Sequence, residues 1–129
     1  MMKAEDIAKK AADLVGGDRQ QQHGDKTANH AAIAALWNGI IEARKANGKT
    51  GPLDALDVAN MMEALKIARR YSGKHNDDDY IDAAGYAAVA GEIAGSVALD
   101  EAFSRPHAQS VEERAYMLDE AIFNPLDSF

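Results

Sequence analysis

Residues 54–100 decide the fold and read DALDVANMMEALKIARRYSGKHNDDDYIDAAGYAAVAGEIAGSVALD. Asp54 is a suitable N-cap, and apolar side chains then recur every three or four residues, the period of an α-helix with one buried face. This apolar line consists of Val58, Met61, Met62, Leu65 and Ala68. The pattern predicts one helix over residues 54–71 and, after the acidic run that ends at Asp82, a second over residues 78–103.

The flanking sequence continues the helical pattern. Amphipathic segments predict further helices over residues 3–15 and 29–46, and a capping box at Ser110 predicts a satellite helix over residues 111–123. Alanine, the strongest helix former, is the commonest residue, and no stretch alternates like a strand. The sequence therefore predicts an all-α, single-domain bundle of about five helices over residues 1–129.

Composition excludes several classes of function. The chain has 129 residues, no cysteine and a formal net charge of −7. Disulfides, thiolate nucleophiles and thiolate metal sites are excluded, and the acidic surface disfavours duplex nucleic acid. Residues 1–15 interleave charge with alanine, so we expect neither a signal peptide nor a membrane partner. The expected location is the cytoplasm.

The run from Asp77 to Asp82 is the first candidate for a site. Residues three or four apart on a helix share a face, so Asp78 or Asp79 converges with Asp82 in a way that suits a hard cation. The alternative is structural, because acidic residues at a helix N-terminus complement the helix dipole. A calcium loop is excluded, since its required glycine and glutamate positions are not met.

The preceding helix offers a second set of polar side chains. Asn60 and Glu63 form another pair of oxygen ligands on one face, and Lys66 and Arg69 follow on adjacent turns, where they can neutralise phosphate oxygens. The alternative is that Glu63 and Lys66 form an ordinary surface ion pair. If both pairs are functional, the two helices, packed antiparallel, present four oxygen ligands together.

These two motifs carry a resemblance to a known family. Asn60-x-x-Glu63, followed after a gap by Asp79-x-x-Asp82, resembles the MazG-like all-α nucleoside triphosphate pyrophosphohydrolases, whose pattern is Glu-x-x-Glu and then Glu-x-x-Asp. The resemblance implies a four-helix core, and Mg²⁺ or Mn²⁺ bound by Asn60, Glu63, Asp79 and Asp82. It also implies catalysis by Glu63, Asp79 and Asp82, with hydrolysis of a (d)NTP to (d)NMP and pyrophosphate by a metal-activated water. Asn60 and Asp79 depart from the family pattern, since both stand where the family has glutamate.

Other residues are assigned to substrate. The loop at residues 18–27 carries Arg19 and His23, which we expect to close over a bound base or phosphate, although a solvated loop is an equal alternative. Tyr86, one turn after Asp82, is a further substrate candidate. Trp37 lies on the apolar line of its helix, so we expect core packing in preference to base stacking.

Two rival interpretations remain. The layout is also similar to small helical proteins encoded by bacteriophages, through Trp37 and the motifs Gly17-Asp18-Arg19, His23-Gly24-Asp25, Lys66-x-x-Arg69 and Asp82-x-x-Gly85-Tyr86. If a phage encodes the chain, the expected cytoplasm is that of the host. The rival function is a non-catalytic protein that sequesters a nucleotide or binds a host protein, and a degraded metal site would favour it. The small residues Ala84, Ala88, Gly91 and Gly95 form a stripe that invites close helix packing. We therefore expect a homo-oligomer, a dimer or larger; a purely structural oligomer is the third possibility.

Overall fold

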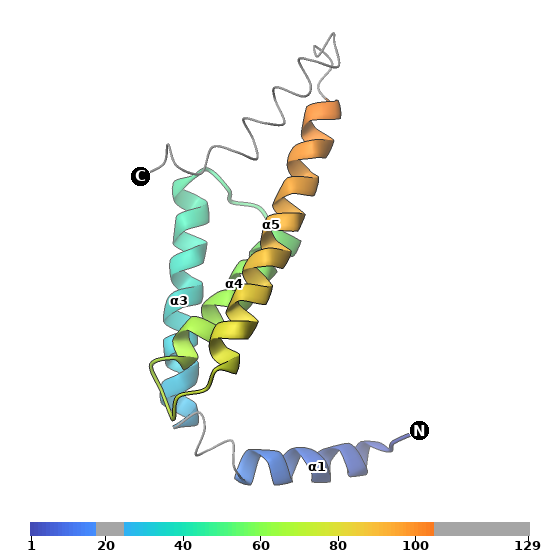
Figure 1. The fold of residues 1–129 in the computed structure, drawn as a ribbon, viewed down its shortest axis with the longest axis vertical. Helices are drawn as coiled ribbons and strands as arrows, with labels where there is room; N and C mark the ends of the chain where they lie inside the picture. Colours follow the sequence, from blue (N-terminus) through green and yellow to red (C-terminus); the bar gives the residue numbers. More distant parts are fainter. Residues whose placement is uncertain (18–24, 105–129) are drawn as a thin grey trace. The chain divides into compact units, whose positions relative to one another are not determined.

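The computed structural model describes residues 1–17 and 25–104 (Figure 1). These residues contain no strand and form four α-helices: α1 (Ala4–Gly16), α3 (Lys26–Ala46), α4 (Ala55–Arg69) and α5 (Asp78–Ser104). The prediction of an all-α fold is confirmed. The helix predicted over residues 111–123 lies outside the described residues.

Side-chain caps explain where the central helices begin. The Asp25 carboxylate accepts a hydrogen bond from the Ala28 N–H at 2.8 Å, so α3 begins at Lys26, three residues earlier than predicted. Asp54 is the N-cap of α4, as expected, and forms a capping box with Asp57. Both N–H···O bonds of that box are 2.9 Å long. The start of each helix is thus fixed by a local aspartate.

The chain divides into two compact units, residues 1–87 and residues 88–129, and each is described by itself. In the first unit, α3 packs against α4. The indole Nε1 of Trp37 on α3 donates a 2.7 Å hydrogen bond to the carbonyl oxygen of Met61 on α4. Trp37 is half-buried, and it joins the two helices in the way expected of a packing residue. The buried hydrophobic side chains of these two helices are Ile33, Ala59, Met61, Ala64 and Ala68.

The buried face of α4 differs from the predicted apolar line. Val58 is 53% exposed, whereas the neighbouring Asp57 is only 7% exposed. Asp57 lies inward because its carboxylate is 3.0 Å from Nε of Arg44 on α3. The ion pair between the helices and the small alanines, which allow close approach, bury the face of α4 that carries Asp57. The larger Val58 therefore lies on the exposed side.

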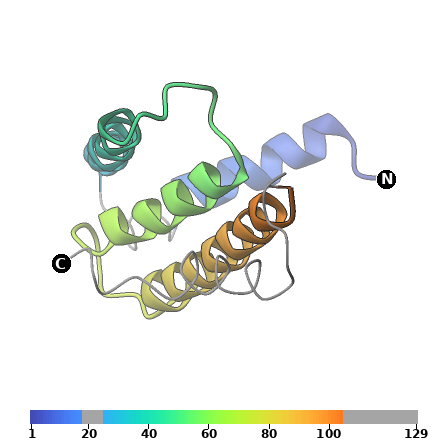
Figure 2. The same cartoon turned by 90° about the horizontal axis from the view of Figure 1, so that it is seen from above.

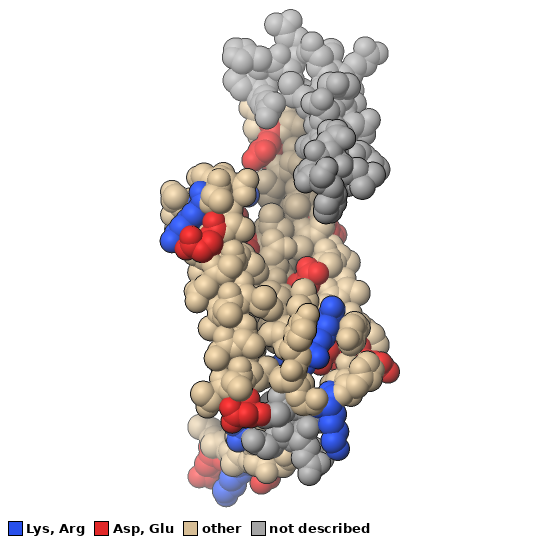
Figure 3. Space-filling model, turned by 90° about the vertical axis from the view of Figure 1, so that its left-hand side faces the viewer, with Lys and Arg blue, Asp and Glu red and all other residues tan. Residues whose placement is uncertain are grey.

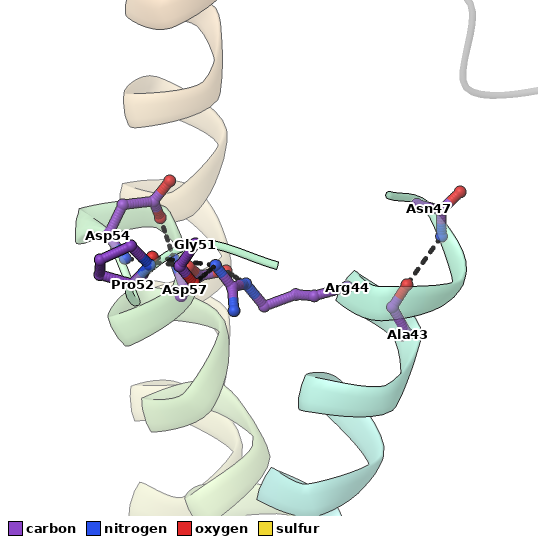
Figure 4. A network of polar contacts seen from close by, with 7 residues as sticks. All are labelled: Ala43, Arg44, Asn47, Gly51, Pro52, Asp54 and Asp57. Carbon is purple, nitrogen blue, oxygen red and sulfur yellow. Dashed lines mark hydrogen bonds and ion pairs between the residues drawn. The ribbon is translucent and has the colours of Figure 1, made fainter. Parts of the chain in front are cut away.

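Arg44 also holds the connection between the two helices. Its Nη2 donates to the carbonyl oxygens of Gly51 and Pro52, at 3.1 and 2.9 Å. Figure 4 shows the guanidinium reaching from α3 to both carbonyls and to Asp57. Figure 2 shows the path of the connection from the end of α3 to the start of α4. One side chain therefore stabilises both the loop and the helix pair.

Two predicted packing surfaces are exposed. No residue of α1 is buried, and Ile7 and Leu14 on its apolar line are 55% and 53% exposed. In the small-residue stripe, a Cβ added at Gly91 or Gly95 would meet nothing within 4 Å. None of the described helices is long and apolar enough to cross a membrane.

Candidate functional site

The first contact of the site joins α4 to the beginning of α5. Nζ of Lys66 lies 2.9 Å from Oδ2 of Asp82. The Lys66 side chain is only 14% exposed, whereas the Asp82 side chain is 44% exposed. The ammonium is thus largely withdrawn from water, while the carboxylate stays accessible to a ligand.

A second contact fixes the direction of the two helices. The Arg70 guanidinium lies over the Tyr80 ring, 4.2 Å from its centroid, in the geometry of a cation–π interaction. Arg70 follows Lys66 in the chain, whereas Tyr80 precedes Asp82, so α4 and the first turns of α5 run antiparallel here. From the Lys66–Asp82 pair, three residues forward on α4 lead to Arg69 and three residues back on α5 lead to Asp79. Each step is about 4.5 Å along its helix, so Arg69 and Asp79 lie at about the same level.

Arg69 and Asp79 differ from the pair beside them. Asp79 is only 3% exposed, yet its carboxylate makes no hydrogen bond or ion pair within the described residues. Nε of Arg69 is buried and has no hydrogen-bond partner there. Because a buried guanidinium nitrogen is normally paired, Arg69 has unused capacity for an interaction, whereas the Asp79 oxygens are not among the fully buried atoms without a partner.

The other site residues proposed from the sequence belong to no metal-binding group in the described part of the chain. Asn60, Glu63 and Tyr86 are half-buried, and no hydrogen bond or ion pair of their side chains is found in the described part of the chain. Within residues 1–17 and 25–104, no group of three or more His, Asp or Glu side chains could hold a metal ion. The proposed ligands Glu63, Asp79 and Asp82 are not gathered in this arrangement, and Asp82 is paired with Lys66 instead. Arg19 and His23 lie outside the described residues.

The connection between α4 and α5 contains contacts that sequence reasoning missed. Ser72 donates from Oγ to Oδ1 of Asn29, at 3.3 Å, and Asn29 is only 5% exposed. His75 Nε2 lies 2.8 Å from Oδ1 of Asp77, and its ring centroid is 5.9 Å from that of Tyr80. These partners have no regular spacing in the sequence, so no periodic signal could have identified them.

The site therefore combines opposite charges from two helices. Lys66 and Arg69 contribute two cations from one face of α4, and Asp79 and Asp82 contribute two carboxylates from one face of α5. Lysine and arginine are the residues that bind phosphate oxygens, whereas carboxylates accept hydrogen bonds from hydroxyl and amino groups or bind hard cations. The array has the chemistry to bind a ligand that carries both phosphate and donor groups.

These features define a small all-α protein with a mixed-charge array between two helices. The chain belongs to a family described as a domain of unknown function, DUF6378, whose model matches residues 6–94. It is 40% identical over 79 residues to the Gene 55 protein of Mycobacterium phage L5, covering 61% of this chain and 46% of that protein. It is 33% identical over 84 residues to the Gene 55 protein of Mycobacterium phage D29, covering 65% and 50%.

The chain spans about half the length of these curated relatives. Both relatives are phage proteins, which supports the bacteriophage resemblance found in the sequence. The matched family range includes α3, α4 and all four charged residues of the array. No solved structure matches the chain.

Proposed function

We propose that the chain binds a nucleotide, with its phosphates on Lys66 and Arg69. The observation that carries the proposal is the placement of these two cations, on successive turns of α4, beside the carboxylates of α5. Both basic side chains are at least half-buried, and partial burial strengthens a charge-assisted hydrogen bond. Asp79, which is buried and whose side chain has no partner among the described residues, supplies an acceptor for a hydroxyl or amino group of the same ligand.

Nucleotide binding is tested directly by titration of the full chain with ribo- and deoxyribonucleoside triphosphates, in EDTA and in magnesium. Lys66→Met and Arg69→Met should each weaken the affinity about tenfold, because each removes a charged phosphate contact. Lys45→Met is the matched control, since Lys45 pairs with Glu42 at 3.3 Å on the exposed surface of α3. Absence of binding at millimolar nucleotide, in both conditions, would contradict the proposal.

Hydrolysis is a second candidate, favoured by Asp79 and Asp82 on one face of α5. In this form the substrate is a (d)NTP and the products are a (d)NMP and pyrophosphate. The carboxylates do not form a metal-binding group in the described arrangement, so no catalytic step is assigned to a metal ion. Pyrophosphate release with Mg²⁺ or Mn²⁺ that Asp82→Asn abolishes would establish catalysis. Binding without release would establish a protein that sequesters nucleotides.

Failure of both assays would leave two interpretations, a phage protein that binds a host protein and a purely structural oligomer. The names of the relatives, Gene 55 protein, carry no statement of activity. The outcomes therefore separate an enzyme and a nucleotide-binding protein from these two interpretations without reference to the relatives.

A further inference from the structure

The ion pair between α4 and α5 occupies a group that the proposed phosphate site needs. Nζ of Lys66 lies 2.9 Å from Oδ2 of Asp82, so the ammonium already has an anionic partner in the chain alone. A carboxylate and a phosphate accept hydrogen bonds from the same N–H donors. A phosphate placed beside the Asp82 carboxylate would also meet a like charge, so the two anions compete for Lys66.

The exposure of the two partners decides which of them moves. The Lys66 side chain is only 14% exposed, so its charge is costly to leave unpaired, and it keeps an anionic partner. The Asp82 side chain is 44% exposed, so its carboxylate regains hydration when it leaves the lysine. Lys66 therefore has two alternative partners, Asp82 in the chain alone and a phosphate group in the complex.

The second cation of the site has no such competitor. Nε of Arg69 is buried and makes no hydrogen bond within residues 1–17 and 25–104, and no ion pair of this side chain is found there. Arg69 follows Lys66 by three residues and shares its face of α4. Among the described contacts, the competition thus affects only the lysine.

We propose that Asp82 is an internal competitor of the phosphate site, and that it occupies Lys66 until a phosphate group displaces it. The inference rests on the proposed phosphate site and concerns its regulation. The apparent affinity falls with the fraction of molecules in which Lys66 is free, so Asp82 weakens the binding of every anion by the same factor. A polyphosphate, which adds contacts to Arg69, overcomes this loss, whereas a weakly bound anion does not.

The test follows two-dimensional NMR spectra of the isotope-labelled full chain during titration with inorganic phosphate and with inorganic tripolyphosphate, in EDTA. Asp82→Asn should bind both anions about fivefold more tightly than the wild type, because the amide has nearly the same shape and lacks the competing charge. Asp82→Ala also removes the acceptor oxygen and should gain at least as much. Equal affinities of the wild type and both variants, or no anion binding by any of them, would overturn the proposal. Circular dichroism of each variant checks that the helices are intact.

The comparison of the two anions separates competition from long-range repulsion. Repulsion by a distant negative charge grows with the charge of the anion, so its removal would help tripolyphosphate more than phosphate. Competition for Lys66 predicts the same factor for both anions. Glu42→Gln is the charge-matched control, since it removes one negative charge from an exposed pair on α3 and should change neither affinity. An equal gain in Glu42→Gln, or a gain that rises with the charge of the anion, would overturn the proposal.

Lys66→Met tests whether the gain passes through the shared lysine. It keeps an apolar stem and removes the ammonium, so adding Asp82→Asn to this variant should bring no further gain. A gain as large as in the wild type would disprove the competition.

The nucleotide titration of the wild type separates this inference from the proposed function. Nucleotide binding that Asp82→Asn leaves unchanged would keep the proposed function and disprove the competition. Tighter binding of both inorganic anions by Asp82→Asn, without nucleotide binding by the wild type, would keep the competition and disprove the proposed function.

Discussion

Arg44 connects three points of the chain through a single guanidinium. Its side chain is 13% exposed, and it contacts Asp57 and the carbonyl oxygens of Gly51 and Pro52. Arg44→Met should lower the free energy of unfolding by about 3 kcal/mol, because it leaves the Asp57 carboxylate buried without its partner. Lys45→Met, one residue further, removes an exposed pair and should cost roughly 0.3 kcal/mol. Equal urea midpoints for the two variants would contradict a stabilising role for Arg44.

Asp54 gives the stability of α4 a dependence on pH. The hydrogen bond from the Asp57 backbone N–H lowers the pKa of the Asp54 carboxyl, with help from the Asp57 side chain and the charges of Lys49 and Arg44, while desolvation opposes the shift. A lowered pKa in the folded state stabilises above the ordinary pKa of aspartate, about 3.9. This contribution is lost as the pH falls through the lowered pKa. Urea denaturation from pH 6 to pH 2 should therefore show a larger free energy of unfolding for the wild type than for Asp54→Asn at pH 6, and this difference should shrink below about pH 4. A difference that stays constant with pH would contradict this assignment.

At the scale of the element, the end of α3 depends on the backbone of one glycine. Gly48 has a φ of 79°, in the left-handed region that other residues adopt at a cost. A Cβ at Gly48 would meet nothing within 4 Å, so the cost of Gly48→Ala is conformational and should be about 1 kcal/mol. Gly51→Ala is the control, because Gly51 also has open space but no positive φ. Thermal unfolding should occur at a lower temperature for Gly48→Ala than for Gly51→Ala. A Gly51→Ala variant as unstable as Gly48→Ala would disprove the explanation.

At the scale of the whole molecule, the small size of the buried core favours self-association. No large side chain is fully buried in the part of the chain that the structure describes. Residues 27–41 of α3 carry no Asp, Glu, Lys or Arg, and Figure 3 shows the corresponding face as mostly uncharged. We therefore propose a dimer or larger assembly, as the Ala/Gly stripe of α5 first suggested.

Gly91→Leu tests this assembly. No atom lies within 4 Å of a Cβ at Gly91, so the added side chain has space around its first carbon within the chain, and loss of the oligomer would point to contact with a second copy. Light scattering should show a dimer or larger species for the wild type and a smaller mass for the variant. A wild-type monomer at high micromolar concentration would disprove self-association.

The sequence alone determined the helices, because their signals are local. Apolar side chains at helical spacing and aspartates at helix N-termini act within a few residues, so the all-α class and the cap at Asp54 could be predicted. The same local geometry placed Lys66 with Arg69, and Asp79 with Asp82, on common helix faces. The family resemblance supplied the proposed metal ion and the reaction, and both remain proposals.

Only the tertiary structure decided which side chains meet. Asp57 is buried in place of Val58 because Arg44 on α3 forms an ion pair with it. The spacing of residues within α4 cannot predict a partner on another helix. Likewise, Lys66 and Asp82 are paired through the register between α4 and α5, where the sequence predicted two separate motifs for phosphate and metal. Helical periodicity fixes the face on which a residue lies, whereas its partner depends on how two helices are positioned against each other, and that position is set by packing and charge over the whole helix pair.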